Sequence, residues 1–315
     1  MKLAALICIF VVVVRPVPCR AQTADRDAIV KASTLDRAGK PKAAEAVLRS
    51  ATASHPQSET LHAALGQLLF RQKQYEDAVQ ELGLALQINP ESRQNSFLLA
   101  EALIGWGHFG VAVDFLHAVK DKFGNYAEFH YDLGLAYYSS NKIKEAKAEM
   151  EEAVRLAPDL DRAQYLLAAC IASQGDYAKA VEIFRKLVKE HPGNANYWAT
   201  FGQMLSQLGS NHLSEALRAC RRAQALKPKD AHVQYVTATV LMQNGDFSEA
   251  RPLFENLQRL NPKELSAHIA LARIYGRLGE HLLARKETEI VNQLESEKAT
   301  AAGTQENPGG SEQRQ

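Results

Sequence analysis

Alanine recurs along this chain with a fixed period, and this period constrains the fold more than any other feature of the sequence. The spacing is 34 residues, apart from one interval of 36 residues after the fifth member: Ala44, Ala78, Ala112, Ala146, Ala180, Ala216, Ala250 and Ala284. A repeat of this length is typical of chains that stack one small supersecondary unit many times. We therefore expect an array of repeats in place of one globular core.

Two other positions keep the same period. Prolines follow the alanines by twelve residues, with Gly124 once in their place: Pro56, Pro90, Pro158, Pro192, Pro228 and Pro262. A turn-forming residue precedes most alanines by five residues, with Lys73 as the exception: Gly39, Gly107, Asn141, Gly175, Gly245 and Gly279. Glycine adopts positive φ at little cost, and proline ends a helix because it has no backbone N–H. Each period therefore predicts a helix, a turn, a second helix and a stop.

The unit resembles the tetratricopeptide repeat family, whose pattern is W-x2-L-G-x2-Y, then A-x3-F, then P. The clearest matches are Leu65-Gly66, Leu133-Gly134 with Tyr137, Trp198 with Gly202, and Ala180 with Phe184. The resemblance implies an all-α fold, an α-solenoid of about eight helix-turn-helix repeats that form a right-handed superhelix. The repeats are expected at residues 25–58, 59–92, 93–126, 127–160, 161–194, 195–230, 231–264 and 265–298.

Small residues at the eighth and twentieth places of each repeat predict a close approach of its two helices. Larger apolar residues at the twenty-fourth place, such as Phe184 and Phe254, are expected to fill the space between repeats. The two extra residues of the sixth repeat, around residues 209–212, are expected in its inter-helix turn.

The two ends of the chain differ from the array at 22–298. Residues 1–21 contain Lys2, an apolar run over residues 3–14, and small residues at Cys19 and Ala21. These features predict a secretory signal peptide cleaved before Gln22, since the run is too short to span a bilayer. The chain is then expected to be exported, periplasmic or secreted, and not inserted in the membrane. Residues 299–315 lack apolar periodicity and are expected to be disordered.

The sequence argues against several function classes. The 37 Lys and Arg residues balance 36 Asp and Glu residues, so a nucleic-acid partner is not expected. Glycines at 105, 107 and 110 match a dinucleotide fingerprint, but they cross an inter-helix turn and follow no strand. We identify no catalytic residues, no cofactor and no metal site. Cys170 and Cys220 are expected to be buried free thiols, and His62, His130 and His268, which share the fourth place of their repeats, to serve packing.

In the resembled family, the first helix of each repeat lines a concave surface through a few fixed places. The residues at those places, called here the predicted groove residues, are Phe70, Arg71, Phe97, Glu101, Tyr131, Tyr138, Tyr165, Gln203, Gln207, Tyr235, Met242, Arg273 and Arg277. Aromatic rings beside glutamine and arginine suit a protein or peptide ligand. Packing between neighbouring repeats is the alternative role for the aromatic members.

The expected function is a non-enzymatic interaction scaffold or adaptor of the bacterial cell envelope that binds a peptide or protein in this groove. An accessory or regulatory subunit of an envelope polysaccharide- or peptidoglycan-processing enzyme is the alternative. A catalytic solenoid is a third, weaker interpretation. The sequence does not identify the partner or the oligomeric state.

Overall fold

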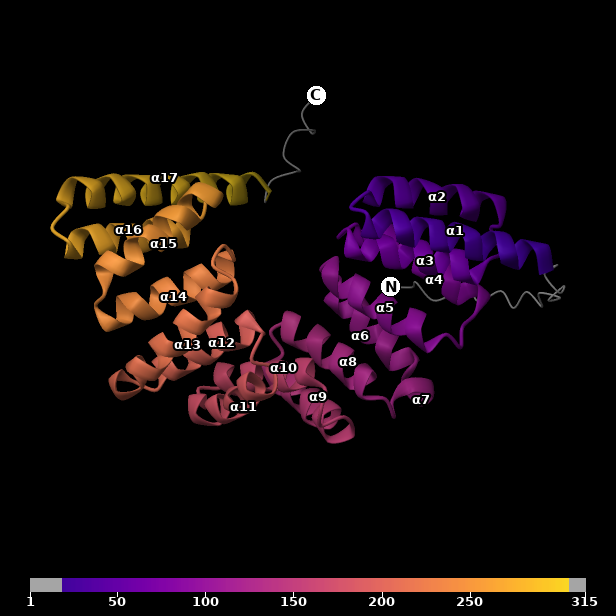
Figure 1. Ribbon diagram of the computed structural model, residues 1–315, viewed down its shortest axis with the longest axis horizontal. Coiled ribbons are helices and arrows are strands. Elements are labelled where there is room, and N and C mark those ends of the chain that lie inside the picture. Colours follow the sequence, from indigo (N-terminus) through magenta and orange to yellow (C-terminus); the bar gives the residue numbers. More distant parts are fainter. Residues whose placement is uncertain (1–18, 306–315) are drawn as a thin grey trace, which may run out of the picture. The chain divides into compact units, whose positions relative to one another are not determined.

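The computed structural model describes residues 19–305, and every regular element in this range is helical (Figure 1). The elements are 17 α-helices and one short 3-10 helix, η1 (Ser210–His212). The predicted all-α, helix-turn-helix architecture is therefore confirmed for these residues. The chain divides into two compact units, Met1–Glu149 and Met150–Gln315, and the boundary lies within α9 (Ile143–Leu156).

The first unit contains α1 to α8 and the start of α9. The bounds of its helices are α1 (Cys19–Arg37), α2 (Pro41–Ser54), α3 (Glu59–Arg71), α4 (Tyr75–Ile88), α5 (Arg93–Gly105), α6 (Phe109–Ala118), α7 (Lys120–Phe123) and α8 (Ala127–Ser139). Helices pack on near neighbours along the chain, as in α1 on α2 and α3 and α5 on α6 and α8. Contacts are therefore local along the chain, which is the arrangement of a stacked repeat protein.

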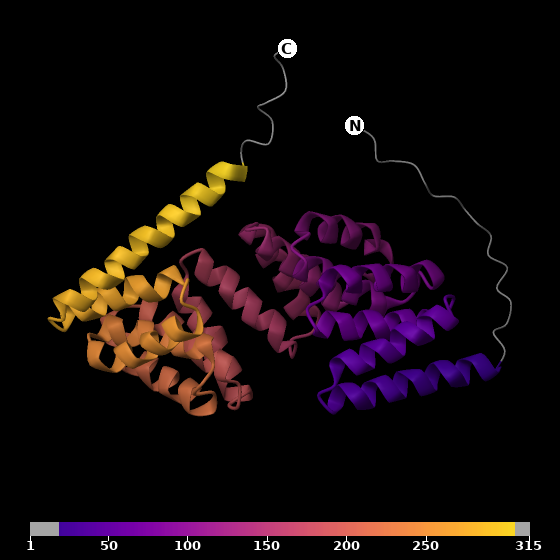
Figure 2. The same ribbon diagram turned by 90° about the horizontal axis from the view of Figure 1, so that it is seen from above.

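The second unit contains the rest of α9 and eight further helices. Their bounds are α10 (Asp161–Ser173), α11 (Tyr177–Glu190), α12 (Ala195–Gln207), α13 (Leu213–Leu226), α14 (Ala231–Asn244), α15 (Phe247–Leu260), α16 (Leu265–Arg277) and α17 (His281–Gln305). Within it, α12 packs on α13 and α14, and α16 packs on α15 and α17. Figure 2 shows the successive helix pairs from above. The extra residues of the sixth repeat form η1 between α12 and α13, where the sequence predicted an enlarged turn.

The inter-helix turns depend on residues with positive φ. Such residues follow the first helix of each pair: Gly39, Lys73, Gly107, Asn141, Gly175, Gly209, Gly245 and Gly279. Lys73, the exception in the sequence pattern, has φ of 61° and thus adopts the same conformation as the glycines. A non-glycine residue is strained in this conformation, so the fold imposes the turn against the local preference.

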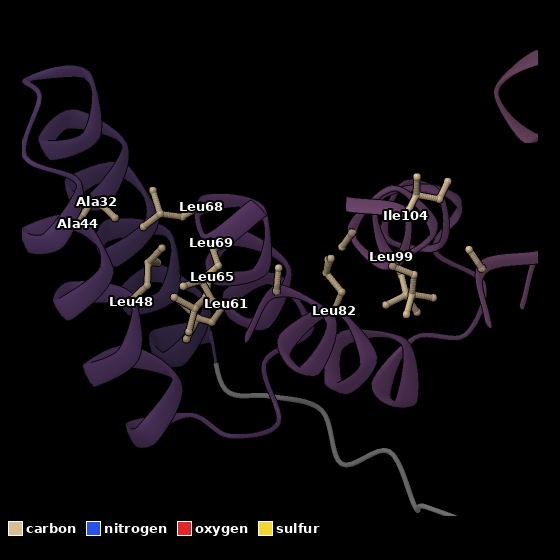
Figure 3. Close-up of a cluster of buried hydrophobic side chains, with 14 of the residues drawn as sticks. Ala32, Ala44, Leu48, Leu61, Leu65, Leu68, Leu69, Leu82, Leu99 and Ile104 are labelled. Atoms are coloured by element: carbon tan, nitrogen blue, oxygen red, sulfur yellow. The ribbon is translucent and has the colours of Figure 1, made fainter. Parts of the chain in front are cut away.

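Small residues allow the two helices of a pair to approach closely. The periodic alanines from Ala44 to Ala250 are fully buried. A Cβ atom added at Gly66 would lie 2.7 Å from Cγ of Leu82, and one at Gly202 would lie 2.6 Å from Sγ of Cys220. The predicted close contact between the eighth place and the second helix is confirmed at these glycines. Figure 3 shows the resulting core of the first unit, in which Leu61, Leu65 and Leu69 lie near Leu48 and Leu82.

The predicted ends differ in part from the structure. Residues 1–18 of the predicted signal peptide and residues 306–315 of the predicted tail lie outside the described residues. The expectation of disorder from residue 299 is corrected for 299–305, which continue α17. Ala299, Ala301 and Ala302 in this stretch have high helix propensity. Among residues 19–305, none of the helices combines the length and the apolar character needed to cross a bilayer.

Candidate functional site

Several predicted groove residues of the first unit contact other side chains of the same unit. The ring of Phe70, at the end of α3, contacts that of Tyr75 edge-on, with 5.8 Å between centroids. Arg71 is exposed and forms an ion pair with Asp36 at 2.9 Å. Phe97 on α5 contacts Phe123 edge-on at 5.8 Å. Both phenylalanines therefore join the core of this unit, as the packing alternative expected.

The other members in the first unit are Glu101 on α5 and Tyr131 and Tyr138 on α8. All three side chains are half-buried. They lie on the first helices of their pairs, where the sequence placed them, and each retains some exposed surface.

Tyr165 on α10 is surrounded by other side chains of the second unit. Its ring stacks on that of Tyr197 with 5.7 Å between centroids and an interplanar angle of 28°. It also contacts the ring of Phe184 edge-on at 5.4 Å, and its hydroxyl lies 3.4 Å from that of Thr200. Packing between neighbouring repeats accounts for these contacts of Tyr165.

Tyr235 on α14 has a different environment, although it is also a predicted groove residue. Its side chain is 40% exposed, and its ring contacts Phe254 edge-on at 5.9 Å. A cavity of about 460 Å³ opens beside it, lined by residues of α14, of α15 and of the start of α16. The lining residues are Ala231, Tyr235, Leu257, Leu260, Asn261, Glu264, Ser266 and Ala267. Leu260, at the end of α15, is 62% exposed. We call this site the Tyr235 cavity.

The remaining members are polar or flexible side chains of the second unit. Gln203 and Met242 are half-buried, whereas Gln207 is exposed. On α16, Arg273 and Arg277 are both exposed, and the guanidinium of Arg277 lies 5.4 Å from the centre of the Phe247 ring. Arg277 is thus partly engaged by an aromatic neighbour.

A second cavity, of about 640 Å³, lies in the first unit near the start of α1. Ile29, Val30 and Ile88 contribute apolar surface to it, and Asp25 with His55 contributes a polar contact of 2.5 Å between carboxylate and imidazole. Sequence reasoning did not single out this site, because its lining combines residues from both ends of the first repeat with the end of α4.

Sequence reasoning also missed the role of the fourth place of the repeat. In most repeats the side chain there contacts the carbonyl oxygen of the residue six positions earlier, usually the periodic proline. The contacting pairs are His62 with Pro56, His130 with Gly124, Gln164 with Pro158, Trp198 with Pro192, Gln234 with Pro228, and His268 with Pro262. The signal was present in the sequence as a nitrogen-bearing side chain at a fixed distance after the proline.

The three histidines of this series make a second contact through Nδ1. Their partners are glutamates of the second helix of the same repeat: Glu81 at 2.7 Å from His62, Glu149 at 2.7 Å from His130, and Glu287 at 2.6 Å from His268. Each imidazole thus links a repeat boundary to the second helix. The histidines therefore have a structural role, through hydrogen-bonding contacts to a carboxylate and a carbonyl that the expectation of packing did not include.

The described part of the chain offers little for covalent or metal chemistry. Within residues 19–305, no group of histidine, cysteine, aspartate and glutamate side chains is arranged to hold a metal ion. Cys170 and Cys220 are both buried and neither is part of a disulfide, as predicted. Burial raises the pKa of Cys220 to about 12, which opposes formation of the reactive thiolate. Gly107, in the rejected dinucleotide fingerprint, lies in the turn between α5 and α6 with φ of 86°.

Two sequence-family models match the chain, and both are described as tetratricopeptide repeat. TPR_16 matches residues 131–195 and 235–289. TPR_19 matches residues 37–99 and 172–240. Together the two models cover more than half of the 315 residues.

Three curated proteins are similar to parts of the chain. Superkiller protein 3 of Schizosaccharomyces pombe is 29% identical over 110 residues, which are 35% of this chain and 8% of that protein. The human Protein O-mannosyl-transferase TMTC1 is 27% identical over 53% of this chain and 19% of its own length. The Vi polysaccharide export protein VexE of Salmonella typhi is 25% identical over 53% of this chain and 26% of its own length. The chain spans less than a third of the length of each of these relatives.

Solved structures agree with this assignment at the level of the fold. A tetratricopeptide repeat protein from Parabacteroides merdae superposes with a TM-score of 0.64 at 16% identity, over 80% of this chain and 99% of that one. The Pseudomonas aeruginosa protein PilF superposes with a TM-score of 0.56 at 18% identity, over 70% of this chain and 99% of that one. Taken with the family models and the periodic helix pairs, these matches show that the chain belongs to the tetratricopeptide repeat family.

Proposed function

We propose that this chain is an exported, non-enzymatic scaffold that binds a protein or peptide in the bacterial cell envelope. Members of the tetratricopeptide repeat family bind proteins and peptides. Binding of a protein or peptide is therefore the general function of this chain. The observation that carries the proposal for this chain is the Tyr235 cavity. There, a tetratricopeptide repeat array presents an exposed aromatic ring and the exposed side chain of Leu260 beside an open, mainly apolar cavity.

Physical chemistry supports a role in binding for this surface. Removing apolar surface from water contributes roughly 25 cal/mol per Å². Tyr235 and Leu260 keep much of their surface exposed in the free chain, so a partner that covers them gains this energy on binding. Tyrosine is also among the side chains that most often dominate binding energy at protein interfaces.

Export is supported by the N-terminal sequence alone. The apolar run over residues 3–14, preceded by Lys2 and followed by small residues at Cys19 and Ala21, has the organisation of a cleavable signal. We therefore place the protein in the periplasm or outside the cell. The bacterial assignment belongs to this same proposal.

A second candidate function is that of an accessory or regulatory subunit of an envelope polysaccharide-processing machine. The similarity to a protein described as a Vi polysaccharide export protein favours this candidate, although it covers about half of this chain. Under this candidate the chain still acts by binding, and the partner is a component of that machine.

Export can be tested directly by N-terminal sequencing of the chain recovered from the periplasm or the medium of a bacterial host. The expected result is a chain that begins at Gln22. A chain recovered only from the cytoplasm with Met1 intact contradicts export.

Binding is tested with the purified chain immobilised and exposed to an envelope extract of the source cells. The captured protein is then purified and titrated against the chain by calorimetry, and a stoichiometric complex with a dissociation constant in the micromolar range or tighter is expected. The double variant Tyr235→Ala, Leu260→Glu serves as the matched control. The proposal fails if the wild-type chain and the variant capture the same proteins, or if no captured protein binds after purification.

A further inference from the structure

Two repeats of the second unit carry the same pair of aromatic residues at the same places. Tyr165 and Phe184 occupy the fifth and twenty-fourth places of repeat 161–194, and Tyr235 and Phe254 occupy those places of repeat 231–264. The pairs share one geometry, since the rings meet edge-on at 5.4 Å and 90° in the first and at 5.9 Å and 84° in the second. The first pair is therefore an internal reference for the second.

A third aromatic ring packs against the first pair. Tyr197, at the third place of the following repeat, stacks on Tyr165 and is 8% exposed. Its hydroxyl donates a hydrogen bond to Asp161 at 2.8 Å, and the ring of His191 contacts it edge-on at 5.9 Å. This part of the molecule thus shows which group fits against a tyrosine at the fifth place.

The second pair lacks all of these groups. Ala267 stands where Tyr197 stands in the first, Ala231 replaces Asp161, and Asn261 replaces His191. All three residues line the Tyr235 cavity. The cavity therefore occupies the place that an aromatic ring fills two repeats earlier.

We propose that the Tyr235 cavity receives an aromatic side chain of a bound polypeptide, which stacks on Tyr235 as Tyr197 stacks on Tyr165. The inference rests on the proposed function and names the partner chemistry that its site recognises. Because Ala231 replaces Asp161, the carboxylate that accepts the hydroxyl of Tyr197 has no counterpart at this place. Both oxygens of Glu264, the carboxylate of the lining, already accept hydrogen bonds, from Asn261 at 3.3 Å and from Ser266 at 2.9 Å. The cavity therefore favours phenylalanine over tyrosine, whose hydroxyl would lose a partner on burial.

Charge at the rim adds a second element of recognition. Glu264 is the charged residue of the lining, and its side chain is exposed. A carboxylate beside an apolar cavity favours a lysine or arginine next to the inserted ring. The partner segment is accordingly an aromatic residue adjacent to a basic one.

The test uses a short capped peptide, acetyl-Gly-(4-fluoro-Phe)-Lys-Gly-amide, titrated with the purified chain and followed by fluorine NMR. The key variant is Ala267→Tyr, which places inside the cavity the residue that fills it two repeats earlier. Its matched control is Lys286→Tyr, an equal addition at an exposed position of α17 outside the cavity lining. We expect Ala267→Tyr to weaken peptide binding at least tenfold and Lys286→Tyr to leave it unchanged.

A second variant keeps the test decisive if Ala267→Tyr does not fold. Leu260→Gln replaces the exposed apolar side chain at the rim by a neutral polar one of similar size, so it adds no charge that would attract the lysine of the peptide. It is also expected to weaken peptide binding at least tenfold, with unchanged helical circular dichroism. In competition with the fluorinated peptide, a peptide with alanine in place of the fluorophenylalanine should not displace it, and one with tyrosine should displace it less well than one with phenylalanine.

The outcomes separate this inference from the proposed function. Equal peptide affinity for the wild type, Ala267→Tyr and Leu260→Gln overturns the aromatic site. If the envelope partner is still captured in that case, and is lost with Tyr235→Ala, Leu260→Glu, the scaffold function stands without it. If the peptide binds as expected but no envelope protein is captured, the cavity chemistry is supported and the scaffold function fails.

Discussion

The segments α10–α12 and α14–α16 belong to the same unit and repeat the same helix pattern, yet they use their aromatic residues differently. In α10–α12, the rings of Tyr165, Phe184 and Tyr197 pack against one another. In α14–α16, the ring of Tyr235 meets Phe254 and remains 40% exposed beside a cavity. The main difference lies at the third residue of the following repeat, which is Tyr197 in one segment and Ala267 in the other, and the two polar neighbours of Tyr197 are replaced as well. A residue of the next repeat therefore decides whether a tyrosine at the fifth place packs inside the fold or remains accessible to a partner.

The largest expected effect on stability comes from removing the ring that closes α10–α12. Tyr197→Ala deletes a buried aromatic side chain, and such deletions typically lower the free energy of unfolding by about 3 kcal/mol or more. Tyr235→Ala removes a ring with one aromatic contact and a large exposed surface, so we expect a loss of about 1 kcal/mol or less. Urea unfolding followed by circular dichroism measures both values.

The comparison between the two segments fails if both alanine variants lose similar stability. Tyr197→Phe is the control, because it keeps the ring and removes only the hydroxyl that donates to Asp161. We expect it to retain most of the stability that Tyr197→Ala loses.

The sequence period predicted the helix pairs, the turns and the buried alanines because each depends on residues within one repeat. It also marked Tyr165 and Tyr235 as equivalent, since both stand at the fifth place of a first helix. The structure distinguishes them because side chains from two consecutive repeats meet at that place. Comparing the third residue of each repeat, including Phe129, Tyr197 and Ala267, would have exposed the difference.

Other features could not be predicted from the sequence for similar reasons. Lys73 was an exception to the turn pattern, but the neighbouring helices impose positive φ on it as on the glycines. The histidines at the fourth place were assigned to packing without their partners, because those partners lie in a different helix and at the end of the preceding repeat. Such contacts can be predicted from the sequence only when the repeats are aligned with one another.

The fourth place gives a second comparison of the two segments. Trp198 on α12 donates a hydrogen bond from Nε1 to the carbonyl of Pro192 at 3.0 Å. His268 on α16 contacts the carbonyl of Pro262 at 2.9 Å and also Glu287 at 2.6 Å. His268→Ala deprives a buried glutamate and a carbonyl of a partner, so we expect it to lower the free energy of unfolding by about 2 kcal/mol. Urea unfolding at pH 7 provides the measurement.

Trp198→Phe is the matched substitution in α12. It keeps an aromatic ring and removes one donor, and a loss of about 1 kcal/mol is expected. A smaller loss for His268→Ala than for Trp198→Phe would show that the contact with Glu287 adds nothing to the stability of α16.

A further difference lies at the eleventh place, which is Leu205 in α12 and Tyr275 in α16. The hydroxyl of Tyr275 donates to Glu255 at 3.0 Å. Burial, together with this hydrogen bond and the charge of Glu255, raises the pKa of Tyr275 to about 12. Because the folded state holds the proton more tightly than the unfolded state, this contribution to stability is complete below about pH 10 and is lost as the pH rises through about 12.

The variant Tyr275→Phe tests this dependence. At pH 9 it should be less stable than the wild type by about 1 kcal/mol, because it lacks the hydrogen bond to Glu255. The difference in free energy of unfolding between the wild type and the variant should narrow between pH 10 and pH 12, since only the wild type has a tyrosine here to ionise on unfolding. Urea unfolding of both proteins at several alkaline pH values measures the gap, and a constant or widening gap contradicts the assigned pKa.

The smallest expected effect concerns the ninth and thirteenth places, which are Gln203 and Gln207 in α12 but Arg273 and Arg277 in α16. The guanidinium of Arg277 lies 5.4 Å from the ring centre of Phe247, and such contacts at exposed sites contribute about 0.5 kcal/mol. Arg277→Gln gives α16 the residue of α12 and should lower the free energy of unfolding by about this amount. Arg273→Gln removes an exposed charge on the same helix face and should change stability less. If urea unfolding gives equal losses for the two variants, then the contact with Phe247 contributes nothing beyond the charge itself. In that case the arginine pair is interchangeable with the glutamine pair as far as folding is concerned, and its effect must be sought in binding.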